Sequence, residues 1–383
     1  MRTRKFLPAA LLPALFISAL VEAQVLTPQA PAPTVLSQET PVQATFTPVI
    51  ASLEKAGSQV LRDRPWLNEL YSWNETFDLD HQQVKANETG AYCIGNGHAF
   101  ALVGLSSPLW NWSNLYGASY QEPDLGGLHM SVTRAGLEVW MPKQQVGWVK
   151  RSGVVRVHAE GNGLTVESYD FAPAQLSDDN AWDNPSALVR MVHLVNNGNQ
   201  AESDLDIELK VLPAWNVKLK EREEGRDLIL DQRAARAKKR TVWRLGAFSN
   251  KNVRIWDDNL HYSVPTLQPG EETWVAFFLL SADSTGENHS ETADLRKKGA
   301  VSLLDETRDY YTGWFEKGTT FSGDPKITDL FEIESLIFKC QQSHSGGFSP
   351  LIGYSYTWIR DNNGPIRWFL KTGHPQEARR AMD

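Results

Sequence analysis

The chain has 383 residues, a formal net charge of −8 and 41% hydrophobic residues. This length allows two domains with cores of their own, while the acidic balance argues against a nucleic-acid partner, which attracts basic surfaces. The sequence carries none of the short motifs that mark metal or nucleotide sites, so no cofactor is expected. Its two cysteines, Cys93 and Cys340, are expected to be free, buried thiols.

The first residues are typical of a secretory signal. Three basic residues precede an apolar run from Phe6 to Val21, and a small residue follows this run before Gln24. The run is shorter than the roughly 20 residues of a membrane-spanning helix. We therefore expect residues 1–23 to be a cleaved signal peptide, with no stable membrane anchor, and the protein to be secreted or periplasmic. Residues 24–48 are rich in proline, threonine and glutamine, which predicts an extended linker.

Strand and turn patterns dominate residues 49–286, after a short amphipathic helix predicted between about Pro48 and Arg62. The clearest hairpin signal is Gly161-Asn162-Gly163, because Asn and Gly tolerate the positive φ of a tight turn. A basic run from Arg233 to Arg240 follows an acidic stretch that ends at Asp227, and we interpret the basic run as a solvated hairpin or loop and not as a phosphate-binding patch. Strands are predicted at Val154–His158, Leu164–Tyr169, Ala187–Val195, Leu205–Leu212, Thr241–Phe248, Val253–Trp256 and Thr273–Leu280. Because no helical periods separate them, we expect a large antiparallel β-sandwich and not a βαβ domain.

Beyond residue 286 the hydrophobic period becomes helical. Residues 287–322 are predicted to form a linker helix, centred on Glu291–Lys317 with Gly299 as its weak point. Asp324 as N-cap and Pro325 as first helical residue predict another helix, which Gly346-Gly347 ends. This helix is apolar around most of its circumference, so it must be buried on several sides.

Residues 323–383 are therefore predicted to begin a helical domain that is truncated here. A further helix is predicted to start at Gly364-Pro365 and end at Gly373, and His374-Pro375 opens one more. Two helices and a stub cannot cover one another's apolar faces. We expect either a missing C-terminal part or a partner that covers the exposed helices.

The sharpest candidate site is Tyr356-Thr357-Trp358-Ile359-Arg360-Asp361. Its aromatic residues supply stacking faces, Arg360 supplies a rigid fork of donors and Asp361 an acceptor, which together suit a neutral, hydroxyl-rich ligand. The alternative is structural: an Arg–Asp pair that fixes the start of the helix at Pro365, with Trp358 in the core.

This motif resembles the Trp-x-Arg-Asp motif of glucoamylase-like enzymes of the six-hairpin glycosidase superfamily, where it lies between the first two barrel helices. A second resemblance, to the opening of bacterial glucoamylase-type N-terminal domains, lies in Ile94-Gly95-Asn96-Gly97, Ala101-Leu102-Val103-Gly104 and Asn114-Leu115-Tyr116. The resemblance implies a multidomain β + α protein: a large β-sandwich (a supersandwich), a linker helix and the first helices of an incomplete (α/α)6 barrel.

For the candidate site the resemblance implies binding without catalysis. Arg360 and Asp361 would bind the hydroxyls of the sugar that is cleaved, with Trp358 and Tyr356 as apolar walls. In the family the general acid and base are Glu residues on later barrel loops, here expected beyond Asp383. No catalytic residue is therefore assigned in this chain, and the chain alone is expected to be inactive.

Other candidates remain open from the sequence. Trp110 and Trp112 lie in a loop-like stretch that approaches the barrel mouth in the family, so they are candidate sugar contacts, with core packing equally open. His98 is expected to be a satisfied strand-end histidine and not a catalyst. Glu332 and Glu334 lie two apart on one helix, so they point in different directions and make no substitute catalytic pair.

The leading functional hypothesis is an exported glycoside hydrolase that is inverting and exo-acting on an oligo- or polysaccharide, represented by its N-terminal portion. One alternative is a glycoside phosphorylase of the same superfamily, which would use phosphate in place of water. Another is a non-catalytic carbohydrate-binding or scaffold protein.

Overall fold

The computed structural model describes residues 53, 58–81, 92–104, 110–116, 125–175, 184–214, 217–234, 240–321, 323–348 and 359–382. Ile50–Asp383 forms one compact unit. The predicted signal peptide and linker lie outside the described residues, and the predicted domain boundaries after residues 48, 286 and 322 stay predictions. No helix within the described ranges is long and apolar enough to cross a membrane.

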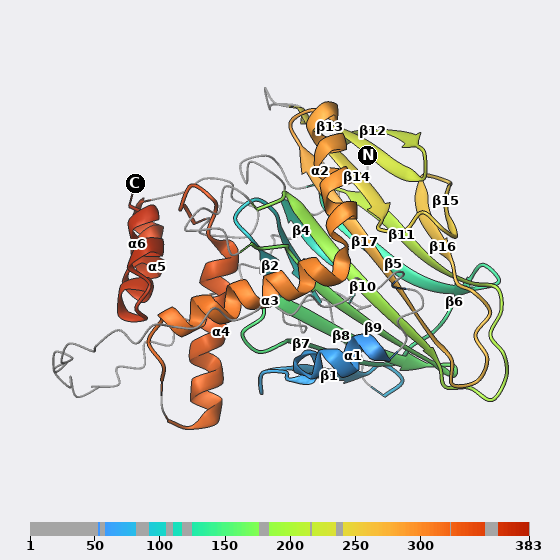
Figure 1. The fold of residues 1–383 in the computed structure, drawn as a ribbon, viewed down its shortest axis with the longest axis horizontal. Helices are drawn as coiled ribbons and strands as arrows, with labels where there is room; N and C mark the ends of the chain where they lie inside the picture. Colours follow the sequence, from blue (N-terminus) through green and yellow to red (C-terminus); the bar gives the residue numbers. More distant parts are fainter. Residues whose placement is uncertain are drawn as a thin grey trace, which may run out of the picture. The chain divides into compact units, whose positions relative to one another are not determined.

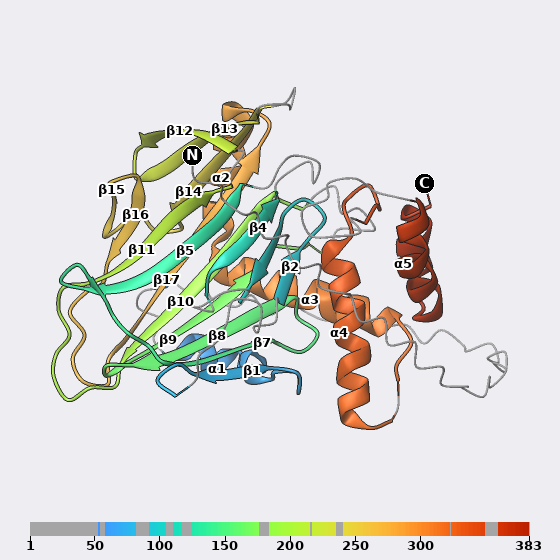
Figure 2. The ribbon, with the colours of Figure 1, turned by 180° about the vertical axis from the view of Figure 1, so that it is seen from behind.

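Two antiparallel sheets form the larger part of the described fold (Figures 1 and 2). The first has nine strands, in the spatial order β1 (Glu75–Asp78), β7 (Lys143–Trp148), β8 (Val154–Gly161), β9 (Leu164–Phe171), β10 (Ala187–Asn196), β17 (Glu272–Ala282), β14 (Arg240–Ala247), β13 (Asp227–Ala234) and β12 (Val217–Glu224). The second runs β15 (Val253–Trp256), β16 (Asn259–Ser263), β11 (Leu205–Pro213), β5 (Gly126–Arg134), β4 (Trp112–Tyr116), β3 (Phe100–Val103) and β2 (Tyr92–Gly95), with β6 (Leu137–Glu138) paired to β5. The predicted antiparallel β-sandwich is confirmed.

Turn chemistry explains the register of the hairpin formed by β8 and β9. Gly161 pairs with Leu164, which leaves Asn162 (φ 49°) and Gly163 (φ 79°) as the turn. Both residues take the positive φ that the sequence predicted, and this suits the right-handed twist of the strands. The strands at Ala187 and Leu205, by contrast, belong to different sheets, so the chain between them crosses the sandwich.

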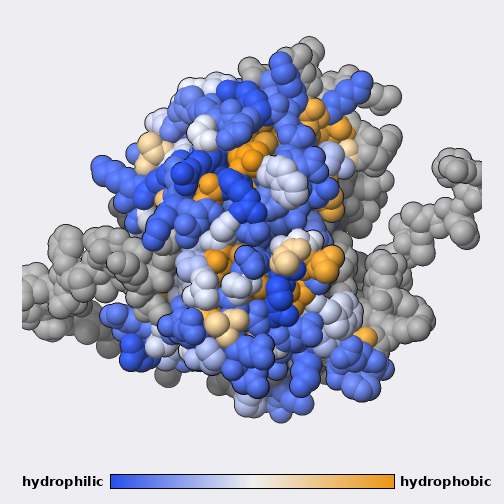
Figure 3. All heavy atoms as spheres, turned by 90° about the vertical axis from the view of Figure 1, so that its right-hand side faces the viewer, coloured by the Kyte–Doolittle hydropathy of each residue, from blue (hydrophilic) through white to orange (hydrophobic). Residues whose placement is uncertain are grey.

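The nine-stranded sheet is covered on both faces. Residues of both sheets, among them Val157, Ile207 and Phe277, form one buried cluster between the sheets. On the other face Trp274 and its neighbours pack against Leu304 of a helix. Coverage on both sides explains why β17 is buried along nearly its whole length and why its apolar residues do not alternate. Figure 3 views the molecule from the β15–β16 side and shows a mainly hydrophilic surface with small, separate apolar groups.

The predicted linker helix is two helices, α2 (Thr285–Lys298) and α3 (Ala300–Lys317). Gly299 separates them with φ 82° and ψ 149°, a conformation that glycine adopts without a steric penalty. The single helix expected across Glu291–Lys317 is therefore wrong, and the break falls at its predicted weak point. The predicted N-terminal helix is short in the described ranges, where α1 spans Gln59–Asp63 and a 3₁₀ turn, η2, spans Pro65–Asn68.

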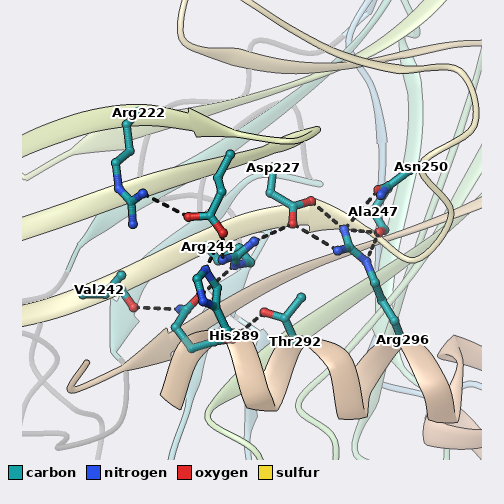
Figure 4. Close-up of polar contacts among 11 residues, drawn as sticks. Arg222, Asp227, Val242, Arg244, Ala247, Asn250, His289, Thr292 and Arg296 are labelled. Carbon is teal, nitrogen blue, oxygen red and sulfur yellow. Dashed lines mark hydrogen bonds and ion pairs between the residues drawn. The ribbon is translucent and has the colours of Figure 1, made fainter. Parts of the chain in front are cut away.

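A buried ion cluster holds α2 on the nine-stranded sheet (Figure 4). Asp227 of β13 pairs with Arg244 of β14 at 2.8 Å and with Arg296 of α2 at 2.5 Å, and Arg244 also donates to Asn288 of α2 at 2.7 Å. The acidic residues before the basic run lie in the hairpin β12–β13, and residues 235–239 of the basic run fall outside the described residues. Asp227 itself is buried and not solvated, because two guanidinium groups pair with it.

In the part of the chain that the structure describes, three further helices follow: α4 (Pro325–Gln341), α5 (Ile359–Lys371) and α6 (Pro375–Arg380). Asp324 caps α4 by accepting from the N–H of Lys326 at 2.8 Å, as predicted. The α5 prediction was wrong at its start, since the helix begins at Ile359 and includes Pro365. Pro365 removes one backbone hydrogen bond, and Asp361 in the first turn favours the early start by facing the positive end of the helix dipole.

Strand β2 is an edge of its sheet, and α3 and α4 cover it. The Tyr311 hydroxyl donates to the Gly95 carbonyl at 2.5 Å and lies 3.5 Å from Cys340 Sγ. A Cβ at Gly95 would overlap the Cys340 carbonyl, so only glycine allows this approach. Cys93 and Cys340 are both buried thiols, as predicted.

Candidate functional site

Helix α4 presents polar residues to the sandwich. Asp329 accepts from the N–H (2.8 Å) and hydroxyl (2.6 Å) of Ser72 and pairs with Lys150 at 2.9 Å. Burial would raise the pKa of Asp329, but the contacts with Ser72 and Lys150 lower it. Close by on the same face, Glu332 accepts from Arg151 Nε at 2.8 Å. These carboxylates fix α4 against the turn between β7 and β8.

Glu332 and Glu334 point in different directions, as their spacing predicts. Glu332 is buried against the sandwich, whereas Glu334 is half-buried on α4, where burial raises its pKa. A carboxyl already paired with Arg151 is unavailable for proton transfer, so the two make no catalytic pair.

The other side of α4 carries apolar residues that stay exposed. Ile327 is 49% exposed and Leu330 39%, and Leu370 of the neighbouring α5 is 54% exposed. Only part of this side is covered, by contacts such as that between the rings of Phe338 and Phe369 at 6.3 Å. The expectation that α4 is buried on several sides is confirmed only in part: Ile333, Leu336 and Cys340 are buried together with its polar residues, whereas Ile327 and Leu330 near its start stay exposed.

The sequence motif lies at the start of α5. Tyr356 and Trp358 fall outside the described residues, and of Arg360 the structure describes the backbone, in the first turn of α5. Asp361 is half-buried in the same turn. Asn362 next to it is buried and accepts from the N–H of Phe348 at 3.3 Å. The described site is therefore the first turn of α5 and the segment after α4 that contacts it.

This segment, which we call the α4–α5 loop (residues 342–348), is held from two sides. Gln342 Nε2 donates to the carbonyls of Gly346 (3.2 Å) and Glu377 (2.9 Å), which ties the loop to α6. On the sandwich side, the His344 N–H donates to the Gly97 carbonyl at 2.9 Å. The turn between β2 and β3 therefore touches the loop that leads to the site.

Trp110 and Trp112 are core residues in this structure. Each is 2% exposed, and the Trp110 indole N–H donates to the Met130 carbonyl at 2.6 Å. The guanidinium of Arg190, itself paired with Asp170, lies 4.6 Å from the Trp112 ring centroid. Of the two alternatives left open by the sequence, core packing is the one that this geometry supports, since a sugar cannot stack on a ring buried in the sandwich.

A buried polar cluster joins α3, α4 and α6, and sequence reasoning missed it. Lys339 pairs with Glu377 at 2.9 Å, and the Trp314 indole N–H donates to the same carboxylate at 2.8 Å. His374 stacks on Trp314 with 3.9 Å between ring centroids. The signal in the sequence was Lys339, a lysine within the apolar run from Leu336 to Cys340. Among the described residues, no group of three or more His, Cys, Asp or Glu is placed to hold a metal ion.

Comparisons with known proteins identify the fold. No family model matches the sequence, and no curated protein matches it. A bacterial glucoamylase solved with acarbose superposes with a TM-score of 0.52 at 11% identity, over 81% of this chain and 53% of that one. A protein from the human microbiome assigned as a kojibiose phosphorylase superposes with a TM-score of 0.52 at 8% identity, over 75% of this chain and 45% of that one.

The chain thus spans about half the length of these two structures. At such low identity the superpositions are evidence for the fold alone. Over the part of its length that they cover, the chain has the fold of a glucoamylase-like glycosidase.

Proposed function

We propose that this chain is the N-terminal portion of an exported, glucoamylase-like glycoside hydrolase that cleaves an oligo- or polysaccharide from a chain end with inversion. The observation that carries the proposal is the position of the Trp-Ile-Arg-Asp motif at the start of α5, in a fold shared with a glucoamylase that binds acarbose. A sugar there would receive hydrogen bonds from Arg360, donate to Asp361 and stack on Trp358 and Tyr356.

The catalytic carboxylates are proposed to come from further helical hairpins, which would also cover the apolar side of α4 and α5. The exposure of Ile327, Leu330 and Leu370 supports this, because apolar residues at the surface of a helical pair usually meet another helix. An inverting enzyme needs two carboxyls about 6.5–9.5 Å apart across the bond. Neither Glu332 nor Glu334 offers that arrangement.

The test uses the protein encoded by the complete reading frame, assayed for release of reducing sugar from α- and β-linked disaccharides and oligosaccharides. Arg360→Ala and Asp361→Asn should each lower kcat/KM by about 100-fold or more, since they remove charge-assisted bonds to the reacting sugar. Arg367→Ala, an exposed arginine of the same helix, is the matched control and should leave activity unchanged. Full activity in Arg360→Ala would contradict the proposal.

A phosphorylase is the second candidate, because the structure assigned as a kojibiose phosphorylase superposes with the same TM-score as the glucoamylase. Product analysis with and without inorganic phosphate separates the two: a sugar phosphate that forms only with phosphate favours the phosphorylase. Oligosaccharide binding that survives Arg360→Ala, without any cleavage, would favour a non-catalytic binding or scaffold protein.

A further inference from the structure

The turn between β2 and β3 is a rigid part of the sandwich. Asn96 is buried there, and its side-chain oxygen accepts from the N–H groups of His98 (3.0 Å) and Ala99 (2.9 Å). Its side-chain nitrogen donates to the carbonyls of Pro173 (2.6 Å) and Pro185 (2.9 Å). One amide thus bonds four backbone groups, which fixes the shape of the turn and its place in the sandwich.

A stacked pair of histidines joins this turn to the α4–α5 loop. The rings of His98 and His344 lie 4.4 Å apart between centroids, with 7° between their planes. The Gly97 carbonyl, between Asn96 and His98, accepts from the His344 N–H at 2.9 Å, and His344 Nδ1 lies 3.3 Å from the same oxygen. Gly97 has φ 91°, and a Cβ there would lie 3.1 Å from the His344 nitrogen, so the close approach depends on glycine.

The α4–α5 loop connects the histidine pair to the start of α5. It is closed on itself by bonds from the Ser343 N–H to the Gly347 carbonyl (3.0 Å) and from the Gly346 N–H to the Ser343 carbonyl (2.8 Å). At its far end the Phe348 N–H donates to Asn362 at 3.3 Å. A short and continuous series of contacts therefore connects His98 to the turn of α5 that carries Arg360 and Asp361.

We propose that His98 and His344 are positioning residues for a sugar subsite: their stacked rings fix the α4–α5 loop, and the loop fixes the start of α5 with Arg360 and Asp361. The inference rests on the proposed function, because it assigns the same first turn of α5 to a neutral, hydroxyl-rich ligand. It adds that the sandwich takes part in sugar binding through one turn. Burial lowers the pKa of His344, which keeps that ring neutral and suited to stacking at pH 7.

The strongest competing explanation is that the histidines only hold the sandwich and helices together. Sugar affinity and thermal stability separate the two, since misplacing a binding group by about 1 Å can cost about 100-fold in function without unfolding the protein. The control is Arg296→Met, which removes a buried ion pair with Asp227 between α2 and the nine-stranded sheet and leaves the contacts of α4 intact. It should lower the melting temperature and leave affinity unchanged.

The experiment titrates acarbose into the full-length protein by calorimetry. His98→Ala and His344→Ala should each weaken binding about tenfold or more, whereas His98→Phe and His344→Phe, which keep a flat ring in the stack, should lose less than about threefold. If an alanine variant does not fold, the comparison is made between the phenylalanine variants and His98→Asn. His98→Asn removes the flat ring and should weaken acarbose binding about tenfold or more.

The outcomes distinguish this inference from the proposed function. If acarbose does not bind, or if Asp361→Asn binds it as tightly as the wild type, the proposed function fails and the inference fails with it. If Asp361→Asn loses binding while His98→Ala and His344→Ala keep wild-type affinity, the inference alone is overturned. Equal losses in the alanine and phenylalanine variants would also overturn it, because stacking would then play no part.

Discussion

Replacing Lys339 by methionine should destabilise the helical part of the protein by about 3–5 kcal/mol, the usual effect of leaving a buried charge without its partner. Lys339 and Glu377 are 7% and 9% exposed at their side chains, and Nζ lies 2.9 Å from Oε1. The ammonium also lies 5.6 Å from the ring centroids of Tyr310 and Trp314. Methionine keeps the aromatic contact and loses the charge, so the buried carboxylate of Glu377 would keep the Trp314 N–H but lose its cationic partner.

The pKa of Glu377 gives an independent magnitude. Burial would raise this pKa, but Lys339 lowers it from 4.5 to about 2. Since a tenfold change in an equilibrium constant is about 1.4 kcal/mol, the fall corresponds to about 3 kcal/mol. The two arguments agree in size. Because the folded pKa is depressed, this stability is present above about pH 4.5 and is lost as the pH falls toward 2.

Urea unfolding followed by tryptophan fluorescence measures the effect, with Trp314 in the cluster as a reporter. Lys339→Met and Glu377→Gln should each lower the unfolding free energy, and the double variant should lose much less than the sum of the two. Lys298→Met is the matched control, because its pair with Glu306 is about a third exposed on both sides and should be worth at most about 1 kcal/mol. Single effects no larger than the control, or fully additive ones, would refute the reasoning.

Two further predictions concern the same helical region. Burial lowers the pKa of His374 from 6.5 to about 4, so the folded state disfavours protonation of this ring. The free energy of unfolding should therefore be unaffected by His374 above about pH 6.5 and should fall by up to about 3 kcal/mol as the pH drops to 4. Melting temperatures across pH 4–7 should show this fall, and His374→Phe, which keeps the stack on Trp314, should flatten it; an unchanged slope would assign the fall to other groups. Gly95→Ala should lower the free energy of unfolding by about 1–3 kcal/mol, because its Cβ would overlap the backbone of α4. Gly286→Ala is the control and should not destabilise the protein, because the space around Gly286 is open. If Gly95→Ala leaves the urea unfolding curve unchanged, the packing of α4 on β2 is contradicted.

Local chemistry made part of the fold predictable. Asn162-Gly163 needs positive φ whatever surrounds it, and Asp324-Pro325 caps a helix through atoms within the first turn. Gly299 was recognised as a weak point because glycine costs helix stability in any context. Whether it bends or breaks the helix depends on the sheet beneath, which the sequence pattern does not describe.

The polar contacts between the helical part and the sandwich were not predictable, because the residues that form them lie far apart in the sequence. Asp329 meets Ser72 across 257 positions, and the Gly97 carbonyl meets His344 across 247. From the sequence alone, a carboxylate or lysine on a largely apolar helix is interpreted as solvated, because its distant partner is not visible in the local pattern. The same limit applies to Trp110 and Trp112, because an aromatic residue on a loop and one in a core have the same local pattern.

The polar contacts between the helical part and the sandwich determine how α4 and the α4–α5 loop are oriented. The helices contact the sandwich through different chemistry at separate places: an ion pair at Lys150, a tyrosine hydroxyl at Gly95 and stacked histidines at His98. Polar contacts hold only over a narrow range of distance and angle, whereas apolar surfaces can slide. A set of polar contacts at separate positions therefore fixes the orientation of α4 and of the loop that follows it. The proposed sugar site at the start of α5 would need that fixed orientation, because a sugar hydroxyl is bound by groups at set positions and not by area. If the proposed function holds, the sandwich is part of the framework of that site.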